Sequence, residues 1–144
     1  MTDTIVQEAR EWVGTSFVPQ QSVKGHGCDC KGLIAGIARE LSRPEADHVH
    51  MLALDYNLAR VPSDRLKVGM ADLFDRVVGE PEPGDLLLLK VGKQPAHLAV
   101  CTEGGLVDGR AVHASVENGV RETRLRALLK IMPLDSVWRF RPCR

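Results

Sequence analysis

The chain has 144 residues, of which 44% are hydrophobic and 26% are charged, so it is long enough for one domain with a buried core and too short for two ordinary ones. Its 19 basic and 19 acidic side chains give a formal net charge of zero, and it holds 3 Phe, 2 Trp and 1 Tyr. This balance argues against a basic nucleic-acid surface and against base-stacking platforms, so we expect no nucleic-acid partner. We expect residues 1–144 to form a single domain.

The first residues of the chain lack the basic and then apolar layout of a secretory signal. No run in the sequence approaches the roughly 18 apolar residues of a transmembrane helix. We therefore expect synthesis in a cytoplasm, without a signal peptide and without insertion into a membrane. In that compartment the 4 cysteines are expected to stay reduced.

Apolar residues recur at helical spacing in three stretches of the first half of the chain. The first helix follows Thr4 and ends near Gly14, a typical C-cap. The second covers roughly residues 30–42 and begins after the N-cap residue Asp29. The third follows Ser63 or Asp64, and its expected buried side consists of Leu66, Met70, Leu73, Phe74 and Val77. Residues 43–61 are the least regular part, which we interpret as a variable excursion over a cleft.

From Glu80 onward the pattern changes to strands and turns. Residues 85–91 are almost entirely apolar, which predicts a strand buried on both faces. Asn118-Gly119 is a strong hairpin signal. Helices in the first half followed by antiparallel strands indicate an α+β fold. The remaining expected elements are strands at residues 97–102, 112–116, 120–124 and 136–141 and a short helix at residues 125–130.

Cys30 is the candidate nucleophile. Gly25 and Gly27 allow the chain to turn sharply before Asp29, and the second helix begins directly afterwards. A sulfur at a helix N-terminus lies near unpaired amides and the positive end of the helix dipole, which favours the thiolate and lowers the thiol pKa. Because the thiolate is the nucleophilic form, the position suits covalent catalysis. The alternative is an inert cysteine of the core.

A cysteine nucleophile needs a base, and the base needs a group that orients it. His97 and His113 each lie at or near the start of an apolar, strand-like run, which makes them the candidates. The alternative for each is a half-buried strand histidine without a chemical role. On a strand, His97 shares a face with residues 99 and 101, and His113 shares a face with residue 115.

Two short patterns offer a metal site as an alternative. His26, Cys28 and Cys30 alternate along the loop, but a single residue between the cysteines is closer than the usual spacing of paired zinc ligands. His48 and His50 are also two apart, and no acidic or cysteine partner accompanies them. We therefore expect no metal and no other cofactor.

The segments around Cys30, His97 and His113 resemble the NlpC/P60 family of papain-like cysteine peptidases, especially its short members encoded with phage tail genes. The similar segments follow the family's order over nearly the whole chain: residues 12–17 (WVGTSF), 27–33 (GCDCKGL), 83–86 (PGDL) and the two histidine segments. The resemblance implies a papain-like α+β fold with N-terminal helices packed on a C-terminal antiparallel sheet. It also implies that Cys30 is the nucleophile, that His97 is the base and acid, and that His113 orients His97.

The resemblance further implies a substrate. We expect hydrolysis of peptidoglycan stem peptides at the bond between D-γ-glutamyl and a diamino acid, through a thioester acyl-enzyme. Such an enzyme would reach the cell wall on a phage or phage-like tail tip or through lysis. We favour the tail tip, with other tail-tip proteins as partners. Two alternatives remain: a structural tail-tip protein that keeps the fold without turnover, and an amidase or acyltransferase with the same thiol chemistry.

Two positions depart from the family pattern. Lys31 stands where the family commonly has Ser, and Phe17 stands where it often has Tyr. A cation beside the sulfur favours the thiolate, and we expect Lys31 to meet an acidic group of the substrate. Phe17 keeps the packing of the aromatic ring but removes a hydroxyl from the substrate site, so oxyanion stabilisation would rest on backbone amides. Asp29 is expected to cap the helix, and the resemblance also allows it to bind a substrate amine.

Overall fold

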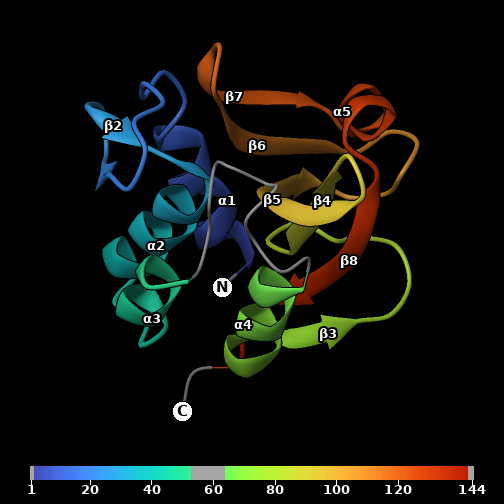
Figure 1. The fold of residues 1–144 in the computed structure, drawn as a ribbon, viewed down its shortest axis with the longest axis horizontal. Coiled ribbons are helices and arrows are strands. Elements are labelled where there is room, and N and C mark those ends of the chain that lie inside the picture. Colours follow the sequence, from blue (N-terminus) through green and yellow to red (C-terminus); the bar gives the residue numbers. More distant parts are fainter. Residues whose placement is uncertain (1, 53–63, 143–144) are drawn as a thin grey trace.

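The computed structural model describes residues 2–52 and 64–142, which form helices and antiparallel strands (Figure 1). The helices are α1 (Thr2–Glu11), α2 (Cys30–Glu40), α3 (Ala46–His50), α4 (Arg65–Leu73) and α5 (Leu125–Ile131). The strands are β1 (Ser22–Val23), β2 (Gly27–Cys28), β3 (Asp75–Val77), β4 (Leu86–Val91), β5 (Gln94–Glu103), β6 (Arg110–Ser115), β7 (Gly119–Arg124) and β8 (Leu134–Arg139).

The main sheet has 6 strands in the order β3-β8-β4-β5-β6-β7. Neighbouring strands in it run antiparallel, as expected from the sequence. Strand β8 pairs with β4 on one side and β3 on the other, so it lies between two strands that precede it in the chain. Strands β1 and β2 form a separate ribbon that leads into α2.

Strand β4 is buried on both faces, as its apolar run predicted. Leu86–Leu89 are fully buried. Because side chains alternate along a strand, two of these leucines pack in the larger core with Trp12, which follows α1, and Leu33 of α2. The other two pack in a smaller core with Leu125 of α5. The sheet is therefore covered on both sides near its middle.

Several expected boundaries differ from the structure. The first helix ends at Glu11 rather than near Gly14, and the second ends at Glu40. The expectation that Val77 lies on the buried side of the third helix is wrong, because α4 ends at Leu73 and Val77 lies in β3, where it pairs with Val137 of β8. Of the irregular segment, the structure shows α3, while residues 53–61 lie outside the described residues.

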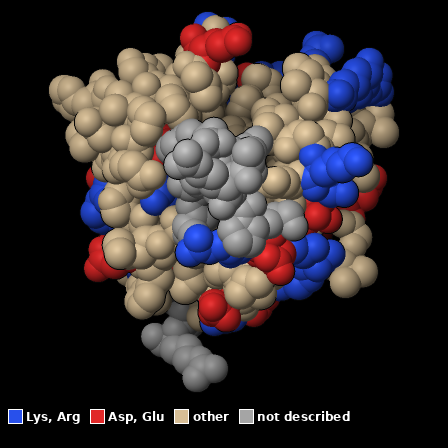
Figure 2. All heavy atoms as spheres, in the orientation of Figure 1, with Lys and Arg blue, Asp and Glu red and all other residues tan. Residues whose placement is uncertain are grey.

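The face of the molecule in Figure 2 carries both acidic and basic side chains, and uncharged surface occupies most of its upper part. This mixture agrees with the zero net charge of the sequence. In the described ranges, every helix is too short or too polar to cross a bilayer.

Candidate active site

The loop before α2 is held so that Cys30 becomes the first residue of the helix. Asp29 is the N-cap, and its carboxylate accepts hydrogen bonds from the backbone amides of Gly32 and Gln20, both at 2.7 Å. The side chain of Asp29 is fully buried. Its two oxygens thus fix the helix start to the preceding loop, which is the capping role that the sequence predicted. A contact between Asp29 and a substrate amine finds no support in this geometry.

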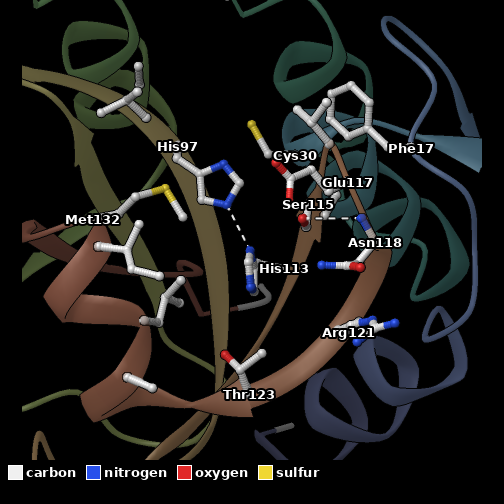
Figure 3. A pocket seen from close by; sticks show the side chains of 17 residues that line it. Phe17, Cys30, His97, His113, Ser115, Glu117, Asn118, Arg121, Thr123 and Met132 are labelled. Carbon is white, nitrogen blue, oxygen red and sulfur yellow. Dashed lines mark hydrogen bonds between the residues drawn. The ribbon is translucent and has the colours of Figure 1, made fainter.

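Cys30 lies against strand β5 at the point that carries His97. Its sulfur accepts hydrogen bonds from the backbone amides of Leu98 and Lys31, and its side chain is 3% exposed. Figure 3 shows the sulfur on the side of the His97 ring that faces away from His113. Cys30 and His97 line the same cavity, so the nucleophile and base expected from the sequence come together.

His113 holds the ring of His97. His97 Nε2 and His113 Nδ1 are 3.0 Å apart, and the two rings stand almost perpendicular, at 86°. His113 lies on β6 opposite Ala99 of β5, on the same face of the sheet as His97, and is nearly fully buried. Thus His113 is placed to orient His97 while His97 keeps its other nitrogen, Nδ1, for Cys30.

This contact fixes the tautomers that catalysis would need. For His97 to accept a proton on Nδ1, its hydrogen must sit on Nε2, which then donates to Nδ1 of His113. A neutral His113 then carries its own hydrogen on Nε2. The opposite arrangement places a hydrogen on Nδ1 of His97 and removes the base. The hydrogen bond therefore serves catalysis in one direction only.

Burial keeps the resting pair neutral. Burial raises the pKa of the Cys30 thiol to about 12, and the hydrogen bonds from the backbone of Leu98 and Lys31 oppose it only in part. Burial, reinforced by the neighbouring His113, lowers the pKa of His97 to about 3. Burial also lowers the pKa of His113. The expectation that the helix terminus lowers the thiol pKa of Cys30 is therefore wrong for this structure, because desolvation is the larger effect.

Phe17 and Lys31 were both expected to contact substrate, but only Phe17 lines the cavity. Phe17 lines the cavity and is held in a β-bridge beside Cys28, which precedes the nucleophile by two residues. Lys31 is 5% exposed, and its Nζ donates to the carbonyl oxygens of His50 at 2.9 Å and Leu52 at 3.2 Å. Its ammonium therefore ties α2 to the end of α3, and the expected contact of Lys31 with an acidic substrate group is not supported.

The histidine and cysteine patterns that offered a metal site do not converge. His48 and His50 lie on helix α3 rather than on a strand, so a spacing of two places them on different sides. His26 is exposed, whereas Cys28 is fully buried. Within residues 2–52 and 64–142, no group of three or more His, Cys, Asp or Glu is arranged to hold a metal ion.

The cavity of about 610 Å³ extends beyond the residues singled out from the sequence. One wall comes from the β6–β7 hairpin (Figure 3), and the other includes apolar residues of α5, Val91 at the end of β4 and Ala96 near the start of β5. The hairpin wall consists of Ser115, Val116, Glu117, Asn118, Arg121 and Thr123. The signal for part of this wall was present in the sequence, since the Asn-Gly turn sets the register in which residues 121 and 123 share a face with His113.

Solved structures share this fold. A NlpC/P60 family protein from Bacillus cereus ATCC 10987 matches with a TM-score of 0.66 and 17% sequence identity, over 99% of this chain and 41% of that one. A protein described as similar to lipoprotein, NLP/P60 family, from Staphylococcus aureus subsp. aureus Mu50 matches with a TM-score of 0.57 and 20% identity, over 99% of this chain and 42% of that one. The chain spans about two fifths of these proteins. It matches no family model and no curated protein.

Proposed function

We propose that the chain is a cysteine hydrolase that cleaves amide bonds in peptidoglycan stem peptides. The observation that carries the proposal is the placement of Cys30 at the start of α2, in one cavity with His97, whose far nitrogen is hydrogen-bonded to His113. The likeness of the fold to NlpC/P60 proteins supports the same reaction class. The expected scissile bond is the amide between D-γ-glutamyl and a diamino acid.

The neutral resting pair requires proton transfer during attack. His97 Nδ1 takes the proton of the Cys30 thiol as the sulfur forms a bond to the substrate carbonyl carbon, which places a negative charge on the carbonyl oxygen. We expect the backbone amide of Cys30 to bind that oxygen, since the amides of Gly32 and Leu33 already donate to Asp29. His97 then gives its proton to the leaving amine, the carbon–nitrogen bond breaks, and a thioester with Cys30 remains.

Water completes the cycle. His97, neutral again, takes a proton from a water molecule as its oxygen attacks the thioester carbonyl. The carbon–sulfur bond breaks, the carboxylic acid leaves, and the proton returns from His97 to the sulfur of Cys30. His113 holds His97 in one tautomer through both halves, because its Nδ1 accepts the hydrogen of His97 Nε2.

The test is digestion of purified peptidoglycan followed by mass spectrometry of the fragments. Cys30→Ala and His97→Ala should abolish new stem-peptide fragments. Cys28→Ala is the matched control, since Cys28 is also buried and lies two residues away, but does not line the cavity. Fragments from the native protein and from Cys28→Ala, and none from Cys30→Ala, are the expected result. Equal fragments from Cys30→Ala would refute the nucleophile.

One observation favours a second candidate, a structural protein without turnover. Burial of Cys30 raises the pKa of its thiol to about 12, which disfavours the reactive form. On that reading the chain serves assembly of a phage or phage-like tail tip and keeps the fold only. Absence of fragments from several wall types, together with no faster iodoacetamide labelling of Cys30 than of Cys28, would favour this function. Fast labelling of Cys30 without cleavage would instead favour the amidase or acyltransferase alternative.

A further inference from the structure

Arg121 is the cationic residue of the cavity wall. It lies on β7 directly opposite His113 of β6, so both side chains project from the same face of the sheet. Among the described residues that line the cavity, Arg121 is the only lysine or arginine. Figure 3 shows it with Asn118 on one side of the cavity, away from Met132. A positive charge therefore lies on the wall of the cavity that Cys30 and His97 also line, next to His113.

The backbone that carries Arg121 is fixed relative to the nucleophile loop. The neighbouring Val120 donates to the carbonyl oxygen of Thr15 at 2.8 Å and accepts from the amide of Gly14 at 2.9 Å. Gly119 adopts φ +71°, and a Cβ there would overlap the Thr15 carbonyl oxygen. The hairpin tip is thus joined to the segment that leads to Phe17, which fixes the backbone from which the exposed Arg121 side chain projects.

The N–H groups of the Arg121 guanidinium are not engaged in an ion pair with a described carboxylate. The next residue, Glu122, projects from the opposite face and pairs with Arg10 at 3.0 Å. Within residues 2–52 and 64–142, no carboxylate forms an ion pair with Arg121. Glu117 also lines the cavity, at the hairpin tip, without contacting Arg121 within ion-pair distance. A planar guanidinium binds a carboxylate through paired hydrogen bonds, which a neutral amide cannot match.

We infer that Arg121 binds a free carboxylate that the substrate carries next to its scissile amide. The inference rests on the proposed function and narrows its substrate class. A γ-linked glutamyl residue carries a free α-carboxylate on the residue whose side-chain carbonyl is attacked. Amidation of that carboxylate, which leaves the scissile bond unchanged, removes the group that Arg121 binds. Arg121 is therefore a specificity-determining residue for non-amidated stem peptides.

The experiment uses two synthetic γ-D-glutamyl–diamino acid peptides that differ only in a carboxylate or a carboxamide at the α position of the glutamyl residue. Hydrogen bonds to charged groups discriminate by about tenfold or more, so kcat/KM of the native protein should be about tenfold higher on the carboxylate peptide. Arg121→Gln should lose this factor on the carboxylate peptide and leave kcat/KM on the carboxamide peptide unchanged. Arg124→Gln is the matched control, because Arg124 lies on the same strand and lines a different cavity.

Binding to Cys30→Ala, measured by calorimetry, separates this inference from the proposed function. A preference for the carboxylate peptide that disappears in Cys30→Ala/Arg121→Gln supports the inference even if the native protein cleaves neither peptide, in which case only the proposed function fails. Cleavage of both peptides at equal rates overturns the inference and leaves the proposed function intact. An equal loss on both peptides in Arg121→Gln, or binding of neither peptide to Cys30→Ala, also overturns it.

Discussion

Gly32 is the residue at which helix α2 meets the preceding loop, and Gly32→Ala tests how that loop positions Cys30. A Cβ on Gly32 would overlap the backbone carbonyl oxygen of Gln21 and would lie 2.9 Å from Asp29 Oδ1. The loop cannot move away freely, because two hydrogen bonds join it to the start of α2. The Gln21 carbonyl accepts from the Asp29 amide at 3.3 Å, and Ser22 Oγ donates to the Gly32 carbonyl at 2.6 Å.

The magnitude follows from these contacts. Withdrawal of the loop loses the two neutral hydrogen bonds, at about 1 kcal/mol each. Residual overpacking adds about 1–3 kcal/mol. Replacing a helical glycine by alanine stabilises the fold by about 1 kcal/mol, because alanine restricts the conformations of the unfolded chain. We therefore expect Gly32→Ala to lower the free energy of unfolding by about 2–4 kcal/mol. We also expect it to lower kcat/KM about tenfold or more, because Cys30 lies in the same helical turn.

Urea denaturation gives the free energy of unfolding, and peptide hydrolysis gives kcat/KM. The matched control is Gly69→Ala on α4, where a Cβ would meet only the end of the flexible Leu52 side chain. That variant should change stability by about 1 kcal/mol or less, since the leucine moves and the helix gains. If Gly32→Ala proves as stable and as active as Gly69→Ala, the loop does not fix the helix start and the reasoning fails.

Three further predictions concern single groups. Because burial raises the pKa of the Cys30 thiol to about 12, the rate of its alkylation by iodoacetamide should keep rising about tenfold per pH unit above pH 8; a plateau at lower pH would show an ion pair with His97. Burial alone would raise the pKa of Glu122, but hydrogen bonds from Arg10 and Thr102 lower it by more than burial raises it. The pKa in the folded state is therefore below the ordinary 4.5. Glu122→Gln should therefore lower the free energy of unfolding by about 1 kcal/mol or less near neutral pH. Denaturation at decreasing pH should show this cost begin to fall near the ordinary pKa of 4.5 and vanish below the lower pKa of the folded state; a cost that does not change as the pH falls would contradict the pairing. Thr123 Oγ1 is buried without a hydrogen-bond partner in the described part of the chain. Thr123→Val should therefore raise the free energy of unfolding, measured by urea denaturation, by about 1 kcal/mol. A loss of stability would show that the hydroxyl is bonded.

Local signals in the sequence predicted the local elements well. The N-cap at Asp29, the start of α2 at Cys30 and the turn at Asn118-Gly119 all depend on residues that are close in the chain. The burial of β4 on both faces could likewise be predicted directly, because such a strand requires an unbroken apolar run. These features were set by propensity and periodicity alone.

Features that depend on distant partners were missed. Strand β3 has only 3 residues and exists because β8 pairs with it, so Val77 could not be separated from the helix before it. Lys31 turns toward α3 because backbone carbonyls there accept its ammonium. The pKa of Cys30 depends on how completely strands and helix exclude water, which its neighbours in sequence do not reveal. The approach of His97 and His113 to Cys30 was expected from family resemblance, and the catalytic roles of the three stay predictions.

The position of β8 inside the sheet has a consequence for synthesis on the ribosome. Residues 134–139 fill the gap between β3 and β4, and β4 in turn carries β5 with His97. Until this segment leaves the exit tunnel, β4 has one unpaired edge, and nothing joins β3 to the rest of the sheet. The sheet is therefore completed through contacts of long sequence separation, which slow folding. The cavity that Cys30 and His97 line therefore gains its full support from the sheet only after residues 134–139 have been translated.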